Sequence, residues 1–222
     1  MADSLDSLVP LQASSSPSEH IAAQLRERII DGTFDFGEHL YEAHLAARFN
    51  VSRGPVREAV QRLVQEGFLV SNRNRGTSVV EFSHADVMDI YRARLAIERE
   101  AARVLFEAGT STVIDKLDAI YLRMTEALTE QRWSDLARHD IAFHQTIVDA
   151  AGSPRLSKMF STLAGHTLLC VRRYNSVWNS DIKEQHGHLR DLLEAGDATA
   201  YLEEIDSHLL TASRRFTGAL ES

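Results

Sequence analysis

From Ser83 almost to its C-terminal end, the chain shows no strand pattern, and its apolar residues recur with a helical period. A period of about 3.6 residues places apolar side chains on one face of an α-helix. Turn residues interrupt the pattern at Gly109-Thr110-Ser111, near Trp133-Ser134-Asp135, at Gly152-Ser153-Pro154, near Asn179-Ser180-Asp181 and at Gly196-Asp197. The pattern therefore predicts about six helices over residues 83–222, and their short connections predict an antiparallel bundle.

Residues 16–82 begin with a helix signal of a different kind. Ser16 stands at a capping position, Pro17 suits the first helical turn, and Glu19 completes a capping box. This helix is expected to end near Asp31-Gly32, where the apolar periodicity stops.

Two more helices and a hairpin follow within the same segment. Ser52 is the expected N-cap of the second of these helices, after the break Asn50-Val51-Ser52. The expected helices lie at about residues 42–49 and 53–66, and the expected strands at residues 68–70 and 78–82, around a polar tip at residues 72–76. This order of elements predicts a winged helix-turn-helix over residues 16–82, followed by an all-helical domain over residues 83–222.

The composition and the sequence patterns indicate in which cellular compartment the protein is expected. The chain is 44% hydrophobic and 25% charged, as soluble globular proteins are. No apolar run approaches the roughly 18 residues of a membrane span, and the N-terminus lacks the pattern of a secretion signal. Residues 1–15, rich in Ser and Asp, are expected to form a mobile tail. Because Cys170 is the only cysteine, no internal disulfide can form, and we expect a cytoplasmic protein.

Charge is distributed unevenly along the chain. The net charge is −8, which by itself argues against a nucleic-acid partner. Residues 43–80, however, contain six Arg against two Glu, whereas residues 83–222 contain 16 basic and 21 acidic residues. A basic patch on an acidic protein is typical of a DNA-binding domain, although a solvated mixed-charge surface is the simpler reading of the arginines alone.

Polar residues interrupt the apolar stripe of the helix expected around residues 134–151. Asp140 and His144, four positions apart, lie within the stripe that includes Phe143 and Ile147. Two neighbouring residues on one helix surface can reach the same point. Because burial of an unpartnered carboxylate costs several kcal/mol, some group must compensate Asp140.

Two further histidines share this feature. His186 and His208 each lie within the apolar stripe of its own helix, and each is 11 residues from Asp197 in the connecting turn. In an antiparallel pair, both imidazoles therefore lie at one level of the bundle, roughly 16 Å from the turn. One carboxylate and three imidazoles converging in an apolar core predict a site for a divalent transition metal, Zn²⁺, Ni²⁺ or Mn²⁺.

His166 is a fifth histidine with an inward position. It falls in the stripe that contains Leu163 and Cys170, so it can line a cavity or simply pack in the core. A single histidine in such a stripe is more often a hydrogen-bonded core residue than a metal ligand, whereas four in-phase ionisable groups are harder to explain in that way.

With these features the chain resembles the GntR superfamily of bacterial transcription regulators, in its FadR-like subgroup with an FCD effector domain. The resemblance rests on "LAARFNVSRGPVREAVQRLVQEGFLV" and "NRGTSVV" in the first domain. In the helical domain it rests on "RLAIE", "DIAFHQTIVDAAGSPRL" and "HGHLRDLLEAGDATAYLEEIDSHL". It implies a homodimer on a palindromic operator, most simply a repressor, whose DNA affinity changes when a small carboxylic acid binds at or near the metal.

The resemblance also assigns roles to residues. Asp140, His144, His186 and His208 match the metal ligands of the family. Arg94, whose fork of donors suits a carboxylate, together with His166 and Glu98 forms the candidate effector-binding set. The candidate DNA-binding residues are Ser52, Arg53, Arg57, Arg48, Arg73, Arg75 and Gly76; Arg53 and Arg57 would contact bases, and Ser52 phosphate.

Two departures from the family pattern concern DNA recognition. Many relatives have threonine at the position of Gly54, and some read DNA with an arginine at the position of Ala43, for which Arg48 is one turn further along. Both changes concern which operator is bound.

Two other functional classes compete with a regulator. A metal-dependent hydrolase or lyase would need a general acid or base beside the metal, and Glu98 is the only obvious candidate, although it can simply pair with Arg94. A DNA-binding protein with a purely structural metal is the other alternative.

Overall fold

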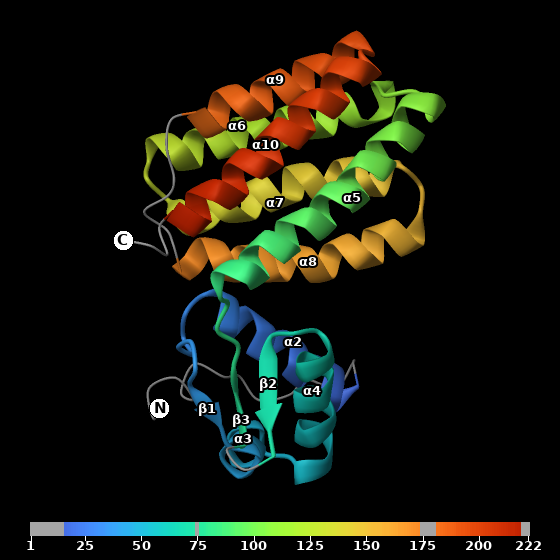
Figure 1. Ribbon diagram of the computed structural model, residues 1–222. Helices are drawn as coiled ribbons and strands as arrows, with labels where there is room; N and C mark the ends of the chain where they lie inside the picture. The colour runs from blue at the N-terminus through green and yellow to red at the C-terminus, as the bar shows by residue number, and fades with distance from the viewer. Residues whose placement is uncertain (1–15, 74–75, 174–180, 219–222) are drawn as a thin grey trace. The chain divides into compact units, whose positions relative to one another are not determined.

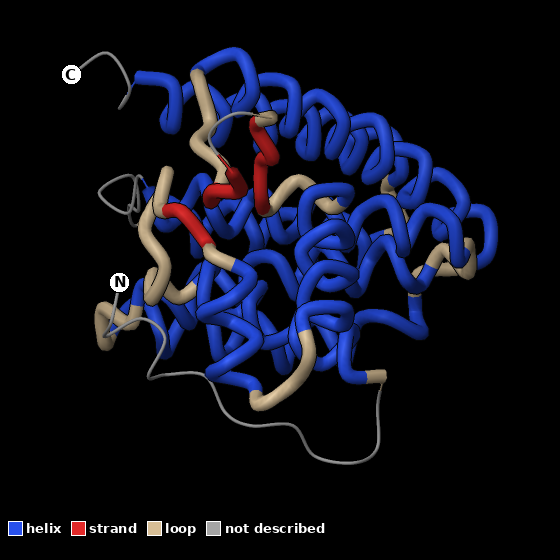
Figure 2. The backbone as a smooth tube through the Cα atoms, turned by 90° about the horizontal axis from the view of Figure 1, so that it is seen from below, coloured by secondary structure: helices blue, strands red, loops and turns tan. Residues whose placement is uncertain are grey.

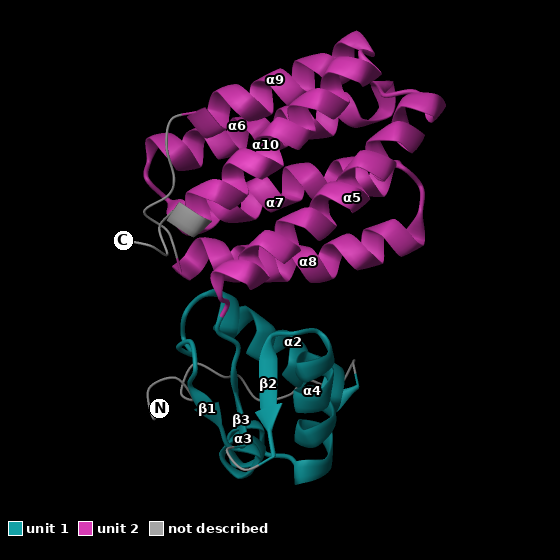
Figure 3. Ribbon diagram, viewed as in Figure 1, with its two compact units in different colours: residues 1–81 teal, residues 82–222 magenta. Residues whose placement is uncertain are grey.

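The computed structural model describes residues 16–73, 76–173 and 181–218. Most of this part of the chain is helical, with only short strands (Figure 1, Figure 2). It divides into two compact units, residues 1–81 and 82–222 (Figure 3). The expected mainly helical class is confirmed. The expected tail at residues 1–15 lies outside the described residues, and the described helices include none with the length and apolarity needed to cross a bilayer.

The first unit is a winged helix-turn-helix. Its helices are α2 (Pro17–Ile30), α3 (Glu42–Phe49) and α4 (Arg53–Gln65), and its strands are β1 (His39–Leu40), β2 (Leu69–Asn72) and β3 (Gly76–Val79). Apolar residues of all three helices form its core, among them Leu25, Leu45 and Leu63, which are at most 1% exposed. α3 ends where Asn50 adopts a left-handed conformation, with φ 54°.

The wing is a three-stranded antiparallel sheet with strand order β1-β3-β2. Asn72 pairs with Gly76 and Leu69 pairs with Val79 in the β2–β3 hairpin. The predicted strands at residues 68–70 and 78–82 were therefore displaced, because pairing across the tip extends β2 to Asn72 and starts β3 at Gly76. β1, which pairs with β3 through His39–Ser78 and Leu40–Thr77, was not predicted.

The second unit is the predicted bundle. Its six described helices are α5 (His84–Ala108), α6 (Ser111–Thr129), α7 (Trp133–Ala150), α8 (Pro154–Arg173), α9 (Asp181–Ala195) and α10 (Ala198–Gly218). One apolar core cluster joins buried residues of these helices, including Leu105, Leu117, Phe143, Leu189 and Ile205. The break predicted near Trp133-Ser134-Asp135 lies at residues 130–132 instead, where Gln131 has φ 57° and α7 already begins at Trp133.

The helix starts at Ser83 and Ser16 differ in their capping. At the start of α5, the Asp86 amide donates to Ser83 Oγ and the Ser83 amide donates to Asp86 Oδ2, at 3.3 and 2.8 Å, so the capping box is present. At the start of α2, the prediction was wrong, because Ser16 makes no side-chain cap and its Oγ lies 2.9 Å from Ser18 Oγ.

This difference predicts the effect of Ser83→Ala. We expect the variant to lower the free energy of unfolding of the helical unit by about 1 kcal/mol, since the Asp86 amide loses Ser83 Oγ as its acceptor and Asp86 Oδ2 loses the Ser83 hydroxyl as a donor. Thr110→Ala is the matched control, because Thr110 is the N-cap of α6 but makes no side-chain cap. Urea unfolding followed by circular dichroism measures both, and equal losses in the two variants would contradict the prediction.

Candidate metal centre and nucleic-acid interface

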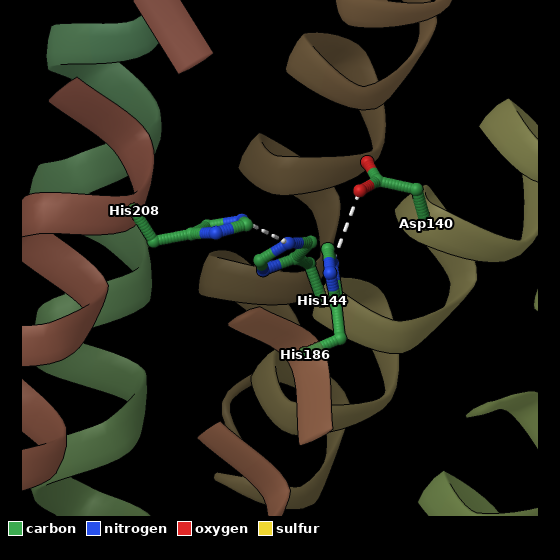
Figure 4. A group of neighbouring side chains, drawn as sticks. All are labelled: Asp140, His144, His186 and His208. Atoms are coloured by element: carbon green, nitrogen blue, oxygen red, sulfur yellow. Dashed lines mark hydrogen bonds and ion pairs between the residues drawn. The ribbon is translucent and has the colours of Figure 1, made fainter. Parts of the chain in front are cut away.

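Three helices bring the predicted metal ligands together. Asp140 and His144 come from α7, His186 from α9 and His208 from α10, and all four are buried. One potential ligand atom from each residue lies within 4.8 Å of the others. Figure 4 shows the four side chains pointing toward one another. The sequence placed His186 and His208 at one level of the bundle, and their ring centroids are 4.8 Å apart.

The separations between these atoms suit ligands of one ion. His186 Nε2 lies 3.0 Å from Asp140 Oδ1, and His208 Nε2 lies 3.3 Å from His144 Nε2 (Figure 4). Two atoms that are each about 2.1 Å from a common ion stand roughly 3.0 to 3.4 Å apart for tetrahedral or octahedral angles. All four side chains are buried, and their facing atoms are carboxylate oxygen and imidazole nitrogen. The donor set therefore fits a divalent transition metal.

Contacts behind the cluster fix the orientation of two imidazoles. His186 Nδ1 donates to the Ile182 carbonyl oxygen at 2.8 Å, which leaves Nε2 as the atom that faces the cluster. His144 Nδ1 lies 2.7 Å from Glu98 Oε2, so its Nε2 also faces inward. Histidine ligands of protein metals commonly use one nitrogen for such a carbonyl or carboxylate and the other for the ion.

Electrostatics keep two of the predicted ligands, Asp140 and His208, in the protonation states that a metal needs. Burial raises the pKa of Asp140, but the hydrogen bond to His186 and the charges of His144 and Arg94 outweigh burial and hold this pKa well below its usual range. Burial, with the nearby His186 and His144, lowers the pKa of His208 well below its usual value. A carboxylate and a neutral imidazole are the forms that coordinate a cation.

Arg94 and Glu98 form a buried pair beside the cluster. Arg94 Nε donates to Glu98 Oε1 at 2.8 Å, and both side chains are at most 4% exposed. Burial raises the pKa of Glu98, but the charges of Arg94 and His144 dominate and lower it. Glu98 thus connects Arg94 to a predicted ligand. Sequence reasoning anticipated its pairing with Arg94 but not its contact with His144, which comes from another helix.

A cavity opens next to this cluster. Its lining includes Arg94, Asp140 and His208. Arg94 Nη2 is buried and has no hydrogen-bond partner within the described residues. The remaining lining residues are Tyr91, Val171, Ile182, Gln185, Leu209, Ala212, Arg215 and Phe216. The cavity therefore reaches two predicted ligands and the guanidinium group whose Nη2 has no partner within the described residues.

Two residues of the predicted effector set do not line this cavity. His166 is half-buried, and its ring packs against Phe82 with a centroid distance of 5.6 Å, so the structure favours the packing alternative for it. Glu98 lies behind Arg94 and His144 instead of facing the open space. Arg215 was missed, although it is seven residues after His208 and so lies on the same face of α10.

The predicted DNA-binding residues lie mostly on the surface of the first unit. Ser52, Arg53 and Arg57, at the start of α4, are exposed, and so are Arg73 and Gly76 in the wing, where Gly76 has φ 79°. Arg48 is half-buried, and Arg75 lies outside the described residues. Ser52 precedes α4 with an extended backbone but makes no side-chain cap, so its hydroxyl does not complete the predicted N-cap bond.

Two residues near the start of α4 escaped the sequence analysis. Glu42 Oε2, in the first turn of α3, lies 3.4 Å from Arg57 Nε, so the start of α3 is next to the exposed face of α4. Tyr41, adjacent to Glu42, is 52% exposed. An exposed aromatic residue at the start of a helix gives no periodic signal in a sequence, and only the contact between the two helices reveals its position.

Comparisons with known proteins agree with this architecture. A family model for bacterial regulatory proteins of the GntR family matches residues 17–79, and a model for the FCD domain matches residues 89–211. A regulator of GntR type from Rhodococcus sp. RHA1 has the same fold, with a TM-score of 0.82 and 24% identity over 92% of this chain and 99% of that chain.

Curated relatives are regulators as well. The gluconate operon transcriptional repressor of Bacillus subtilis (strain 168) is 29% identical over 73% of this chain and 68% of its own length. The Nta operon transcriptional regulator of Aminobacter aminovorans is 30% identical over 71% of this chain and 74% of its own length. For two further relatives, the match covers 61% and 55% of their length.

The FCD match alone covers more than half of the chain, and the proteins that share the two domains regulate transcription and are not enzymes. This finding excludes the alternative of a hydrolase or lyase. The chain belongs to the GntR family of bacterial transcription regulators and carries an FCD domain.

Proposed function

We propose that this regulator represses its target genes by binding an operator through α4 and the wing, and that a small carboxylic acid controls its DNA affinity. The acid would bind in the cavity of the helical unit, beside a divalent transition metal held by Asp140, His144, His186 and His208. The observation that carries the proposal is that one cavity borders both the four-residue cluster and the unpartnered Nη2 of Arg94.

The charges at the buried end of the cavity support an anionic ligand only when a cation is present. Arg94, Asp140 and Glu98 together carry one net negative charge, and the lowered pKa of His208 keeps that imidazole neutral. A divalent ion would turn this into one net positive charge in a buried environment, where charge interactions are strong. When bound, the ion supplies a Lewis-acidic point that attracts a carboxylate.

Arg94 would orient the carboxylate of the bound acid. Its Nε is occupied by Glu98, while Nη2 has no partner within the described residues and remains available to a ligand oxygen. The Tyr91 and Phe160 rings lie 5.1 and 5.6 Å from its guanidinium carbon and hold the group in place. An unsatisfied buried donor costs about 1–3 kcal/mol, and a bound carboxylate would recover this cost.

DNA binding by the first unit follows the geometry of helix-turn-helix proteins. The second helix of the motif, α4, presents Arg53 and Arg57 at its exposed start, as major-groove recognition requires. Arg73 and Gly76 make the wing basic and sterically open at its tip. The resemblance to the family further implies a cytoplasmic homodimer on a two-fold related operator, which sedimentation of the protein with and without operator DNA would test.

The test of the proposed function measures DNA affinity and ligand response together. A duplex selected by the protein from a random-sequence pool is titrated in fluorescence anisotropy, with metal-loaded and chelator-treated protein. Small carboxylic acids, gluconate among them because one relative represses a gluconate operon, are then added. We expect at least one acid to weaken DNA binding of the metal-loaded protein only. If no acid binds or changes the affinity, the metal is structural.

A further inference from the structure

The cavity carries a second guanidinium group at its exposed end. Arg215, near the end of α10, lines the cavity together with Gln185 of α9. The Arg215 side chain is 27% exposed, whereas that of Arg94 is 2% exposed, so the two arginines occupy the outer and the buried parts of the cavity. Nothing in the recognition of a single carboxylate next to the metal requires a second arginine.

The spacing along α10 separates the two ends. His208 and Arg215 are seven residues apart, which places them on the same face of α10 at about 10 Å along its axis. Apolar side chains lie between them in the lining, including Leu209, Ala212 and Phe216. A ligand that fills this cavity therefore meets a polar buried end, an apolar middle and a basic outer end.

Arg215 already holds a carboxylate in this structure. Its Nη2 lies 3.3 Å from Oδ2 of Asp181, the first residue of α9, and the Asp181 side chain is 52% exposed. An ion pair exposed to this degree contributes only a fraction of a kcal/mol to about 1 kcal/mol. A ligand carboxylate delivered from inside the cavity would therefore compete with Asp181 for Arg215.

We propose that the effector carries a second anionic group and that Arg215 binds it, so that the cavity selects short-chain dicarboxylic acids over monocarboxylic acids. The inference rests on the proposed function, since the first carboxylate is the one assigned to the buried end with Arg94. A guanidinium group binds a carboxylate through paired charge-assisted hydrogen bonds, which an apolar methyl end of a monoacid cannot make.

Isothermal titration calorimetry of metal-loaded protein tests the preference. The probes are the diacids succinate, glutarate and adipate and the monoacids of the same chain length, butyrate, pentanoate and hexanoate. We expect at least one diacid to bind about tenfold tighter than its monoacid partner, as one additional charge-assisted interaction provides. Arg215→Gln should remove this preference by weakening the diacid about tenfold, while monoacid binding stays unchanged.

Two further variants make the test specific. Arg214→Gln removes the same charge from the neighbouring exposed position, which does not line the cavity, and it should keep the wild-type preference. Asp181→Asn removes the carboxylate that competes for Arg215, and it should tighten diacid binding, an effect opposite in sign that loss of folding cannot produce. An unchanged preference in Arg215→Gln, or equal binding of both acid series by wild type, overturns the inference.

Failure of the proposed function would look different. In that case neither series of acids would bind or alter DNA affinity, and the inference would fall with it. If monoacids bind and release DNA but diacids show no advantage, the proposed function stands and only the role of Arg215 is lost.

Discussion

Replacing Arg57 with alanine is expected to weaken operator binding by about 10- to 100-fold for each DNA-binding unit. An arginine that contacts a guanine edge contributes roughly 1–3 kcal/mol of discrimination against other bases. The Arg57 side chain is 63% exposed at the start of α4, and its only described side-chain partner is Glu42 at 3.4 Å, an interaction too exposed to matter for stability. Loss of DNA affinity without loss of folding is therefore expected.

Arg62→Ala is the matched control for this variant. Arg62 lies on the same helix and is also exposed, but its Nη2 lies 3.5 Å from Glu19 of α2, which places it away from the start of α4. Fluorescence anisotropy on the selected duplex should show near wild-type affinity for Arg62→Ala. Equal affinities of the Arg57 and Arg62 variants would refute the assignment of α4 as the recognition helix.

Salt dependence separates base contacts from phosphate contacts. A phosphate contact contributes to the slope of log affinity against log salt, so that its removal reduces the slope by about one. Arg57→Ala should leave this slope nearly unchanged while it reduces the preference for the selected sequence over random DNA. Arg73→Ala, in the exposed wing, should weaken binding to both sequences in similar proportion.

The sequence predicted the helices well because their ends carry local signals. Ser83 and Asp86 form a capping box that is visible in four residues, and Asn50 ends α3 in the left-handed conformation that asparagine tolerates. The connection at residues 130–132 has no glycine or proline, and Gln131 adopts a positive φ. The sequence therefore placed this break three residues too late.

The strands were predicted less accurately because their limits depend on distant partners. β1 has only two residues, His39 and Leu40, too few for any alternation to be seen, and it exists because β3 pairs with it across more than 35 residues of chain. The extension of β2 to Asn72 likewise follows from its pairing with Gly76. Neither pairing has a signal in the local sequence.

The convergence of the four predicted ligands could be read from spacing alone. His186 and His208 are equidistant from the turn at Asp197, and Asp140 and His144 share a helix face, so periodicity and antiparallel packing suffice. His166 satisfied the same periodicity but packs on Phe82. Position within an apolar stripe shows that a side chain points inward, but not which neighbours it meets in a bundle of six helices.

The second large effect concerns the metal. The double variant His186→Ala, His208→Ala is expected to lose the metal completely, whereas wild-type protein should contain about one transition-metal ion per chain. Removing two of four ligands leaves only Asp140 and His144, both from α7, and destroys the convergence of three helices on one point. Elemental analysis of the purified proteins after dialysis measures this directly.

His188→Ala provides the control for surface histidines. His188 is two residues after His186 on α9, but its side chain is 58% exposed and only approaches Glu204 at 4.0 Å. Its replacement should leave metal content unchanged. Metal retained in the double variant, or lost equally in His188→Ala, would contradict the ligand assignment.

Stability distinguishes loss of the ion from damage to the core. An ion that binds only the folded state stabilises it by about 4 kcal/mol at a thousandfold excess over its dissociation constant. Chelator treatment of wild type should therefore lower the melting temperature, and addition of the metal should restore it. The double variant should melt at one temperature with or without metal, because the ion has lost its site. Glu98→Gln, which keeps all four ligands but alters the group facing His144 Nδ1, should retain the site and weaken metal affinity about 10- to 100-fold. A chelator shift that persists in the double variant would show that the stabilising ion is bound elsewhere.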